Sequence, residues 1–561
     1  MVYKIADNIT SLLGTTTEQN YQAVKAGRAA LREDARLGLP PEGALTRFET
    51  LVVRSVRETL KDTTFDVSSD RVVFVLSTTK ANVELLGQTD VAPAVLYPGE
   101  SARRIAAYLG FTMMPVVVCN ACISGVSALI LASRMLEMGM YDYAVVCGAD
   151  VLNPFVLSGF DALKALSPED CRPFDIDRNG MNLGEAAATI VLSTEVPDDA
   201  APWVIGAGAV RNDAYHISTP SNKAEGATMA LQAVMNAVGA SSGQELALVN
   251  AHGTGTMFMD QMESVAIVKS GLGDIPVNSY KGYYGHTLGA AGVLETVLTM
   301  RAFDDQTIVG TRGFEELGVS GQLKLSAENQ PTDKTAFVKI ISGFGGGNAV
   351  VYWRKMEGGR WKENTPASFH LSPSHRVTIT PESVTVDGKS LACEGRGKAL
   401  LTALYKQYAS DYPKFYKMDM LCRLGFIAAE LLNGAESQCQ KDGVGGQYQD
   451  NRAMILFNHS SSIHADRAYL ASISDADNYF PSPSLFVYTL PNIVAGELAT
   501  RHHYHGETSF YILPERDERL MWQIQTATFA DPAIDSMISG WLDCEDEDHF
   551  LADLYLLSKP F

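Results

Sequence analysis

The stretch Val116–Gly125 reads VVVCNACISG, an apolar run that breaks into small residues just before a helix-like pattern begins. Cys122 lies at the break. A cysteine in front of a helix feels the partial positive charge of the helix N-terminus, which favours the thiolate. Small Ala121 and Gly125 allow the backbone to approach a bound carbonyl, whose developing oxyanion needs N–H donors. The stretch therefore predicts a buried strand that leads into a nucleophilic thiol.

Two histidines in glycine-rich surroundings follow further along the chain. His252 stands in the sequence NAHGTGT and His286 in the sequence KGYYGHTLGAAG. Two neutral imidazoles that present N–H groups to one carbonyl can stabilise an enolate and assist proton movement. A thiol with two imidazoles, each placed at the end of a strand-like run, favours covalent acyl chemistry over a binding module.

Nearby residues are candidates for supporting roles. Lys281 and Glu295 flank His286 and can orient it, and the glycine loop Gly343–Asn348 can provide a second N–H donor to the oxyanion. Simpler interpretations stay open for each residue type. A lone cysteine after a buried strand is most often a small core residue, and Cys119 keeps that interpretation. A histidine in a glycine loop is more often structural, a lysine solvated, a glutamate on a helix surface, and glycines can simply permit a tight turn.

No metal site is expected from the sequence. The spacing Cys119-x-x-Cys122 occurs in zinc and redox motifs, but no second ligand pair stands at a suitable distance. The run His502–His505 (HHYH) has the composition of a metal-binding tract. It lies in a part of the chain without a candidate thiol, so an exposed helix end is the preferred interpretation.

The overall composition limits the classes of function. The chain of 561 residues is long enough for two or three domains, or for one large fold with an appendage. Its formal net charge of −20 disfavours binding to nucleic acid or to a membrane surface, although a local basic patch can still bind an anionic carrier. We find no apolar stretch long enough to span a bilayer and no signal-peptide pattern at the N-terminus. Eight scattered cysteines do not indicate a disulfide framework, so a cytoplasmic protein is expected.

Strand-like and helix-like segments alternate over residues 1–355, which we call the main module. The helix-like patterns Ser127–Met138 and Lys223–Val238 each end at a glycine. Short runs rich in β-branched residues are apolar on both faces, as strands buried between helix layers must be. These runs span 72–76, 144–147, 188–192, 246–250, 336–341 and 349–353. The alternation predicts an α/β class with largely parallel strands.

The residues beyond 355, which we call the tail, differ in composition. Residues 356–384 are polar, contain glycine and proline, and are interpreted as a linker. Residues 385–561 follow the same order of elements as residues 40–155 and are interpreted as a diverged repeat. The matching segments are 71–76 with 452–457, 115–119 with 508–513, 129–139 with 519–528, and 145–150 with 538–543. The second copy has Pro514-Glu515-Arg516 in the place of Cys122 and therefore lacks the thiol.

The main module resembles a β-ketoacyl-[acyl-carrier-protein] synthase of the condensing-enzyme family. Beyond the segments around Cys122, His252 and His286, further motifs of that family occur in the family's order. They are Arg172-Pro173-Phe174-Asp175, Asp177-Arg178-Asn179-Gly180, Gly184-Glu185, Asp213-Ala214-Tyr215-His216 with Pro220, and Gly343-Phe344-Gly345-Gly346. The resemblance implies a thiolase-like fold with α-β-α-β-α layers built from two βαβαβ halves. A degenerate thiolase-like half, lacking the catalytic cysteine, would be appended to it.

The same resemblance implies a decarboxylative Claisen condensation. Cys122 would accept an acyl group from an acyl carrier protein, and a malonyl group on a second carrier would then lose carbon dioxide. His252 and His286 would support that loss and stabilise the enolate, which attacks the thioester to give a 3-oxoacyl product. Backbone N–H groups of Cys122 and Phe344 would form the oxyanion hole, and Phe344 would also gate the acyl pocket. A cysteine with two histidines is the set of the elongating members of the family.

The resemblance also implies partners and supporting residues. No cofactor is implied beyond the phosphopantetheine that carries the substrates. The implied partner is acyl carrier protein, together with either a second copy of the chain or a related synthase subunit. The remaining positions carried over from the family are Thr254, Thr256, Phe344 and Gly345 for phosphopantetheine or substrate binding, and Lys281 and Glu295 as the supporting pair.

Departures from the family pattern leave the substrate open. Bulky Ile123 follows the cysteine, Ile341-Ser342-Gly343 replaces a more polar approach to the glycine loop, and residues up to about Leu60 match weakly. Fatty-acid, polyene and polyketide synthesis are all open, and the fused tail favours specialised metabolism. Two other functions also stay open: an acyltransferase or malonyl decarboxylase that does not elongate, and a non-catalytic scaffold within a synthase.

The tail resembles the N-terminal half of the same family, most clearly at Phe480–Asn492 (FPSPSLFVYTLPN). Without the thiol and the two histidines it cannot condense acyl groups alone. Partner subunits of aromatic-polyketide synthases also lack the cysteine and shape the chain-length pocket, which is an analogy at the level of the fold. The hypothesis is that the tail packs on the main module and closes part of its surface or interface.

Overall fold

Five strands of the first half of the main module form one mixed sheet. The computed structural model describes residues 1–31, 36–197, 201–239, 245–356, 371–441, 451–475, 477 and 479–559. The strand order is β3 (Val116–Val118), β2 (Val72–Ser77), β4 (Tyr143–Asp150), β5 (Ala186–Ser193) and β1 (Val2–Ser11). β2 runs parallel to β3 and β4, whereas β5 is antiparallel to β4 and β1.

The second half of the main module adds a further mixed set of strands. Their order is β6 (Trp203–Asn212), β12 (Gly347–Lys355), β11 (Ala336–Gly343), β7 (Leu246–Asn250) and β8 (Val277–Asn278). Only the pairs β11–β7 and β7–β8 are parallel. The prediction of largely parallel strands is therefore wrong. Antiparallel strands that are covered on both faces are as apolar as parallel ones, so the composition of a strand does not reveal its direction.

Helices separate and cover these sheets in five layers. The helices α4 (Ser124–Glu137) and α10 (Ala291–Asp304) contact strands of both halves and form the central layer. Both are apolar nearly all round, as helices buried on every side must be. The outer layers contain α2 (Arg47–Leu60) on the first sheet, and α6 (Glu225–Val238) and α8 (Met257–Lys269) on the second half. The predicted thiolase-like α-β-α-β-α layering is confirmed.

The tail has a sheet of its own with the strand order of the first half. The order is β17 (Thr508–Ile512), β16 (Ala453–Asn458), β18 (Ser536–Cys544), β19 (Phe550–Ser558) and β13 (Pro373–Ile379). β16 runs parallel to β17 and β18, and β19 is antiparallel to β18 and β13. These directions are the ones found for β2, β3, β4, β5 and β1.

The segment interpreted as a linker is only partly described. Residues 357–370 lie outside the described residues. β13 lies within the remainder of that segment and pairs with β19, so residues 373–379 belong to the sheet of the tail. A following hairpin strand, β14 (Val384–Val386), pairs with β13.

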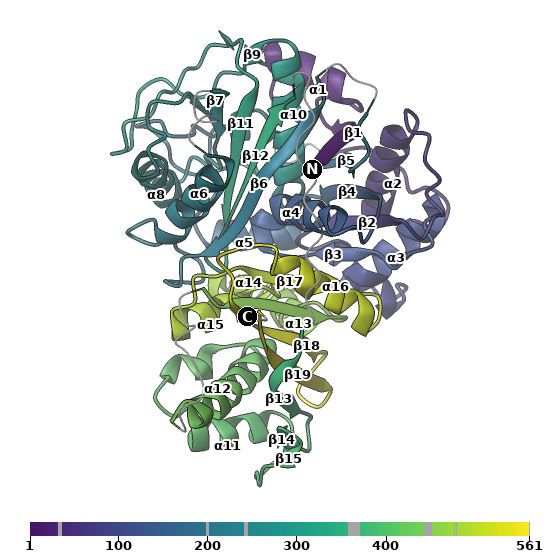
Figure 1. Cartoon of the computed structure of the whole chain (residues 1–561), viewed down its shortest axis with the longest axis vertical. Helices are drawn as coiled ribbons and strands as arrows, with labels where there is room; N and C mark the ends of the chain where they lie inside the picture. The colour runs from purple at the N-terminus through teal and green to yellow at the C-terminus, as the bar shows by residue number, and fades with distance from the viewer. Residues whose placement is uncertain are drawn as a thin grey trace.

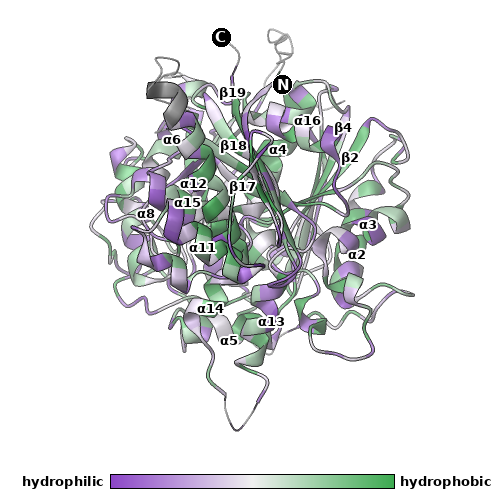
Figure 2. Cartoon of the chain, turned by 90° about the horizontal axis from the view of Figure 1, so that it is seen from below, coloured by the Kyte–Doolittle hydropathy of each residue, from purple (hydrophilic) through white to green (hydrophobic). Residues whose placement is uncertain are grey.

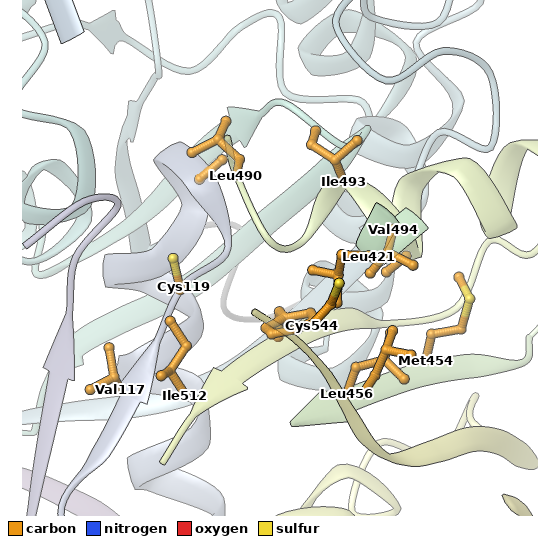
Figure 3. Close-up of a cluster of buried hydrophobic side chains, with 14 of the residues drawn as sticks. Val117, Cys119, Leu421, Met454, Leu456, Leu490, Ile493, Val494, Ile512 and Cys544 are labelled. Carbon is orange, nitrogen blue, oxygen red and sulfur yellow. The ribbon is translucent and has the colours of Figure 1, made fainter. Parts of the chain in front are cut away.

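The two sheets join through their edge strands. β3 and β17 pair antiparallel, with Val117 opposite Ile512 and Val118 opposite Tyr511. Figure 1 shows the tail, coloured green to yellow, below the main module, with β17 and α16 (Glu518–Thr528) at the junction. Figure 2 shows the strands gathered in the middle of the molecule with helices on both sides. The hydrophobic core crosses the junction, and Figure 3 shows Val117 and Cys119 of the main module next to Ile512 of the tail.

Two further helices of the tail border the main module. These are α14 (Pro483–Tyr488), which contacts α5 (Pro154–Ala162), and α15 (Ile493–His502). Within the described ranges, no helix has both the length and the apolar character needed to cross a membrane.

Candidate active site

The predicted thiol lies at a sharp turn between β3 and α4. Ala121 adopts a positive φ of 50°, and a single 3-10 turn, Ala121–Ile123, carries the chain into the helix. Cys122 is 8% exposed and lines a cavity of about 420 Å³. His252, His286 and Phe344 line the same cavity. The structure thus brings together the thiol, both imidazoles and the glycine loop that the sequence singles out.

Burial governs the protonation of the thiol. It raises the pKa of Cys122 to about 12, although the nearby Lys281 ammonium and the backbone N–H groups of Cys122 and Phe344 act in the opposite direction. The sequence predicts a favoured thiolate from the helix N-terminus, but desolvation outweighs that effect here. The resting group is a neutral thiol. The two N–H groups that face the sulfur are the pair proposed for an oxyanion hole.

The two histidines lie close together and are held neutral. Their ring centroids are 5.0 Å apart and the rings are nearly perpendicular. Burial, and secondly the charge of Lys281, lowers the pKa of both imidazoles well below the usual value. The Nδ1 atom of His286 accepts a hydrogen bond from the Leu288 N–H at 3.2 Å, which places the proton of that ring on Nε2. Among the described residues, His286 Nε2 and His252 Nδ1 are buried without a hydrogen-bond partner.

Two carboxylates that sequence reasoning missed hold the His252 loop. Glu263 accepts hydrogen bonds from the N–H groups of His252 (2.6 Å) and Gly253 (2.8 Å), and Asp260 accepts from Thr254 N–H at 2.9 Å. Burial raises the pKa of Glu263 to about 7 and that of Asp260 to about 6. The sequence signal that could have identified them is two acidic residues three positions apart in α8, the helix that directly follows the His252 loop.

The predicted supporting pair, Lys281 and Glu295, is buried together with a third charged residue, Lys339. Lys281 forms an ion pair with Glu295 Oε1, and Lys339 lies 2.5 Å from Glu295 Oε2. All three side chains are at most 3% exposed, so the interpretations of a solvated lysine and a surface glutamate do not hold. Burial lowers the pKa of Lys339 to about 8. Sequence reasoning missed Lys339 because it counted the residue as part of an apolar strand, where a single lysine is itself a signal.

The remaining predicted positions divide between the cavity and the tail. Thr254 and Thr256 line the large cavity with Phe344. Gly345 faces the tail instead, because a Cβ atom there would lie 2.7 Å from Asn492 Nδ2. Cys119 is fully buried in the core, as its simpler interpretation had it. Across the part of the chain that the structure describes, no group of three or more histidine, cysteine or acidic side chains is placed to hold a metal ion.

Models of two domains of one protein family match the main module. The N-terminal domain of β-ketoacyl synthases matches residues 15–197, and the C-terminal domain matches residues 203–315. Together they cover more than half of the chain and include the thiol, both histidines and the Lys281–Glu295 pair. The chain belongs to the β-ketoacyl synthase family.

Individual members of the family align with different parts of the chain. The 3-oxoacyl-[acyl-carrier-protein] synthase 2 of Staphylococcus aureus (strain COL) is 27% identical over 345 residues, covering 56% of this chain and 83% of the relative. The ketosynthase ApeO, solved in complex with its chain length factor ApeC from Xenorhabdus doucetiae, aligns at 25% identity with a TM-score of 0.55 over 63% of this chain and 97% of that one. The PfaC keto synthase–chain length factor aligns over 100% of this chain and 78% of its own, with a TM-score of 0.78 and 13% identity. This last likeness concerns the fold alone, and it extends over the tail.

A second, small cavity lies beyond the thiol of this β-ketoacyl synthase. It measures about 20 Å³ and has almost wholly apolar walls. Such a volume holds roughly one water-sized group. Cys122, Phe160 and Phe344 of the main module line it, together with Phe486 and Leu490 of the tail. The tail therefore forms part of the wall next to the thiol.

Proposed function

We propose that the chain condenses an acyl group carried on Cys122 with a malonyl group carried on acyl carrier protein, releasing carbon dioxide and a 3-oxoacyl-[acyl-carrier-protein]. The observation that carries this proposal is the meeting of Cys122 and two neutral, inward-facing imidazoles in one cavity. The name of the S. aureus relative supports the same reaction.

Acylation of the thiol uses the groups around the sulfur. Because burial keeps Cys122 protonated, its proton has to leave as the sulfur attacks the acyl thioester, and a neutral imidazole in the same cavity can accept it. The N–H groups of Cys122 and Phe344 face the sulfur and can hold the oxyanion of the tetrahedral intermediate. The carrier's phosphopantetheine thiol then leaves with a proton.

Condensation uses the two imidazoles. A malonyl thioester whose carbonyl oxygen accepts N–H bonds from His252 and His286 can lose carbon dioxide, since the electron pair left on carbon is delocalised onto that oxygen. The enolate carbon then attacks the acyl carbonyl on Cys122, a carbon–carbon bond forms, and the sulfur leaves. Neutral rings suit this step because they donate N–H bonds without carrying an acidic extra proton.

Mass spectrometry after incubation with acyl-carrier and malonyl-carrier substrates tests the proposal. The expected result is acylation at Cys122 and a carrier-bound product longer by two carbons. The variant His286→Ala is expected to keep acylation and to lose decarboxylation. Acylation without extension in the unmodified chain would instead indicate an acyltransferase or malonyl decarboxylase, and the absence of both events would indicate a non-catalytic scaffold.

We further propose that the tail takes the place of a second synthase subunit within the same chain. Two observations support this role. The tail repeats the strand order of the first half, and β3 meets β17 in a reciprocal register centred on Val118 opposite Tyr511, with Val117 opposite Ile512 on one side and the Cys119 N–H bonded to the Phe510 carbonyl oxygen on the other. A two-fold related pair of subunits has such reciprocity. ApeO is paired with a separate chain length factor, and PfaC is similar over the whole of this chain.

The oligomeric state and the stability of the separated module test this role. The expected molecular mass in solution is that of a single chain, 60.7 kDa, because the edge of β3 is already occupied and a dimer of whole chains would need another surface. Deleting the tail should expose the edge strand and the apolar core around Val117, so the truncated module should aggregate. A truncated module that stays soluble and fully active would count against the proposal.

A further inference from the structure

The tail contacts the loop that carries the proposed oxyanion donor. Asn492, at the start of α15, donates a hydrogen bond from Nδ2 to the Phe344 carbonyl oxygen at 2.8 Å. Phe344 is also the residue whose backbone N–H faces Cys122. A hydrogen bond to its carbonyl oxygen therefore restrains the position of that N–H as well.

The side chain of Asn492 is not used as a helix cap. Asparagine at an N-cap position usually accepts a backbone N–H of the first turn, but Asn492 makes no such bond. Its Oδ1 atom is buried and has no hydrogen-bond partner in the described part of the chain. The side chain is 7% exposed. What this residue supplies to the structure is therefore the N–H donor that reaches Phe344.

The backbones of the tail and the loop are also in close contact. A Cβ atom at Gly496, one turn along α15 from Asn492, would lie 2.6 Å from the Gly345 carbonyl oxygen. Gly345 has a φ of +89°. The absence of side chains at both positions lets the helix of the tail lie directly against the loop.

The ring of Phe344 is connected to the tail as well. It stacks on Phe160 with ring centroids 6.0 Å apart, and Phe160 meets Phe486 of the tail edge to face at 5.4 Å. Phe486 fits there because Gly159 has no side chain, since a Cβ at that position would lie 2.1 Å from the Phe486 ring. The loop is thus held through its carbonyl, its backbone and its aromatic ring.

A neighbouring loop of the cavity is tied to the same part of the tail. Asn212 donates from Nδ2 to the Gly345 carbonyl oxygen at 2.8 Å and to Thr508 Oγ1 of the tail at 3.0 Å. Its backbone N–H donates to the His505 carbonyl oxygen at 3.1 Å. Both loops that border the cavity near Phe344 are therefore braced by residues 492–508 of the tail.

We infer that the tail sets the closed position of the Phe344 loop, and that Asn492 is the positioning residue for the oxyanion N–H of Phe344. The inference rests on the proposed condensation and deepens it by giving the tail a direct part in acylation. Without the Asn492 bond, the loop is expected to move away from Cys122 more often. Access to the thiol would then increase while acyl transfer, which needs the N–H in place, would decrease.

Two rates measured on the full-length chain test the inference. In Asn492→Ala, alkylation of Cys122 by iodoacetamide should become about tenfold faster, and single-turnover acyl transfer from acyl carrier protein should become slower by on the order of 10²-fold, as for a lost oxyanion donor. Faster alkylation together with slower acyl transfer distinguishes a positioning role of Asn492 from a general loss of stability. The alkylation rate needs no condensing activity, so the inference is tested even if the proposed function is wrong.

A second variant covers the case in which Asn492→Ala does not fold. Asn492→Asp keeps the size of the side chain but loses the amide donor, and burial should raise the pKa of the new carboxyl group. Its acyl-transfer rate, relative to the unmodified chain, should recover as the pH falls, because the protonated carboxyl group can donate an O–H to the Phe344 carbonyl oxygen.

Tyr469→Phe is the matched control. It removes another hydrogen bond between tail and main module, the one between the hydroxyl groups of Tyr469 and Ser158 at 2.9 Å, and should leave both rates unchanged. Normal alkylation and acyl-transfer rates in Asn492→Ala and Asn492→Asp would overturn the inference. Equal changes in Tyr469→Phe would also overturn it, since any contact with the tail would then have the same effect.

Discussion

In the first half of the main module β3 leads into Cys122, whereas in the tail the matching strand β17 leads into the turn Pro514-Glu515-Arg516, which has no thiol. Arg516 points to acids rather than to a cavity with imidazoles, because it pairs with Asp553 at 2.6 Å and with Glu518 at 2.6 Å. The strand and the turn are kept in both regions, but only the turn of the main module carries a thiol and lines the cavity with His252 and His286.

A second comparison concerns the carboxylate at the end of the third strand of each region. Asp150 accepts hydrogen bonds from Thr78 Oγ1 (2.7 Å) and from the N–H of Gly289 (2.7 Å), which lies just after His286. Asp543 likewise accepts from the N–H of Ser460, at 3.0 Å. The first carboxylate links the thiol half to the His286 loop, whereas the second holds a loop of the tail alone. The scaffold recurs in the tail without the half that supplies the histidines.

The largest expected effect comes from removing the thiol at the turn after β3, compared with adding a thiol at the turn after β17. Cys122→Ala should lower the acyl-transfer rate by on the order of 10⁴-fold or more, because the nucleophile is lost. Arg516→Cys should add a thiol to the tail without adding activity, since that turn does not line the cavity shared by His252 and His286. Burst-phase acylation measured by mass spectrometry on both variants and on the double variant checks this. Acylation of the introduced thiol in the double variant would break the comparison between the two regions.

The next effect concerns a buried ion pair that joins the regions. Lys80 of the main module lies 2.6 Å from Asp466 of the tail, and burial raises the pKa of that carboxyl group. Lys80→Met leaves a buried carboxylate without its partner and should lower the free energy of unfolding by about 3–5 kcal/mol. Lys80→Met with Asp466→Leu should recover much of that loss, because a buried pair can be replaced by apolar side chains at little cost. Chemical denaturation measures both.

A surface pair provides the control for that experiment. Lys61 and Glu58 form an ion pair whose side chains are 60% and 37% exposed. Lys61→Met should change the stability little, since exposed pairs are screened by solvent. If Lys80→Met lowered the free energy of unfolding as little as Lys61→Met, the Lys80–Asp466 pair would not hold the two regions together.

The sequence predicted the residues that line the cavity better than it predicted the buried residues that hold them in place. The cysteine stands where an apolar run breaks into small residues, both histidines stand in glycine-rich segments, and the order of these segments resembles that of β-ketoacyl synthases, so their meeting could be predicted. Glu263 and Lys339 act through buried contacts to backbone N–H groups and to Glu295, and an acid in a helix or a lysine in a strand has no such partner in the sequence. The thiol's pKa could not be predicted either, because a helix terminus is visible in a sequence but the extent of burial is not.

The sequence predicted that the tail packs on the main module, but not that the two regions join by pairing β3 with β17. The repeat suggested that the tail has the elements of the first half, but edge strands pair through backbone groups that every residue carries. The pairing of Val117 with Ile512 therefore leaves no pattern of side chains. The same limit explains why the predicted strands at 188–192 and 349–353, which are β5 and β12, were expected to be parallel but are antiparallel.

A smaller effect is expected where the tail lines the acyl cavity. Phe486→Leu removes part of the ring that borders the 20 Å³ cavity next to Cys122. Acylation by longer acyl groups should then rise relative to short ones by roughly tenfold, about the discrimination that one or two methylene groups provide. Competition between acyl carriers of different chain length measures the ratio.

The matched control is Phe415→Leu, a fully buried phenylalanine of the tail that stacks on Tyr405 and does not line the cavity. It should lower stability without changing the preference for chain length. An equal shift in both variants would mean that the tail influences the cavity only through its overall stability.

The smallest effect is expected from pH near the usual pKa of histidine. Burial holds the pKa of His252 and His286 well below the usual value of about 6.5, whereas Asp546 raises the pKa of exposed His549 in the tail. NMR signals of the His252 and His286 rings should therefore still report neutral rings as the pH falls through about 6.5, while those of the His549 ring already report its protonated form.

The buried rings also contribute to the pH dependence of stability. The unfolded chain binds protons at about pH 6.5 that folded His252 and His286 do not, so these two rings lower the free energy of unfolding as the pH falls below that value, whereas Glu263 and Asp260, whose pKa values are raised, act in the opposite direction. The contribution of one ring is therefore measured by difference: the free energy of unfolding of His252→Gln, relative to the unmodified chain, should rise as the pH falls. Ring signals of His252 or His286 that titrated with a midpoint near 6.5 would mean that the rings of the main module titrate like exposed ones, and the contrast between buried and exposed histidines would fail.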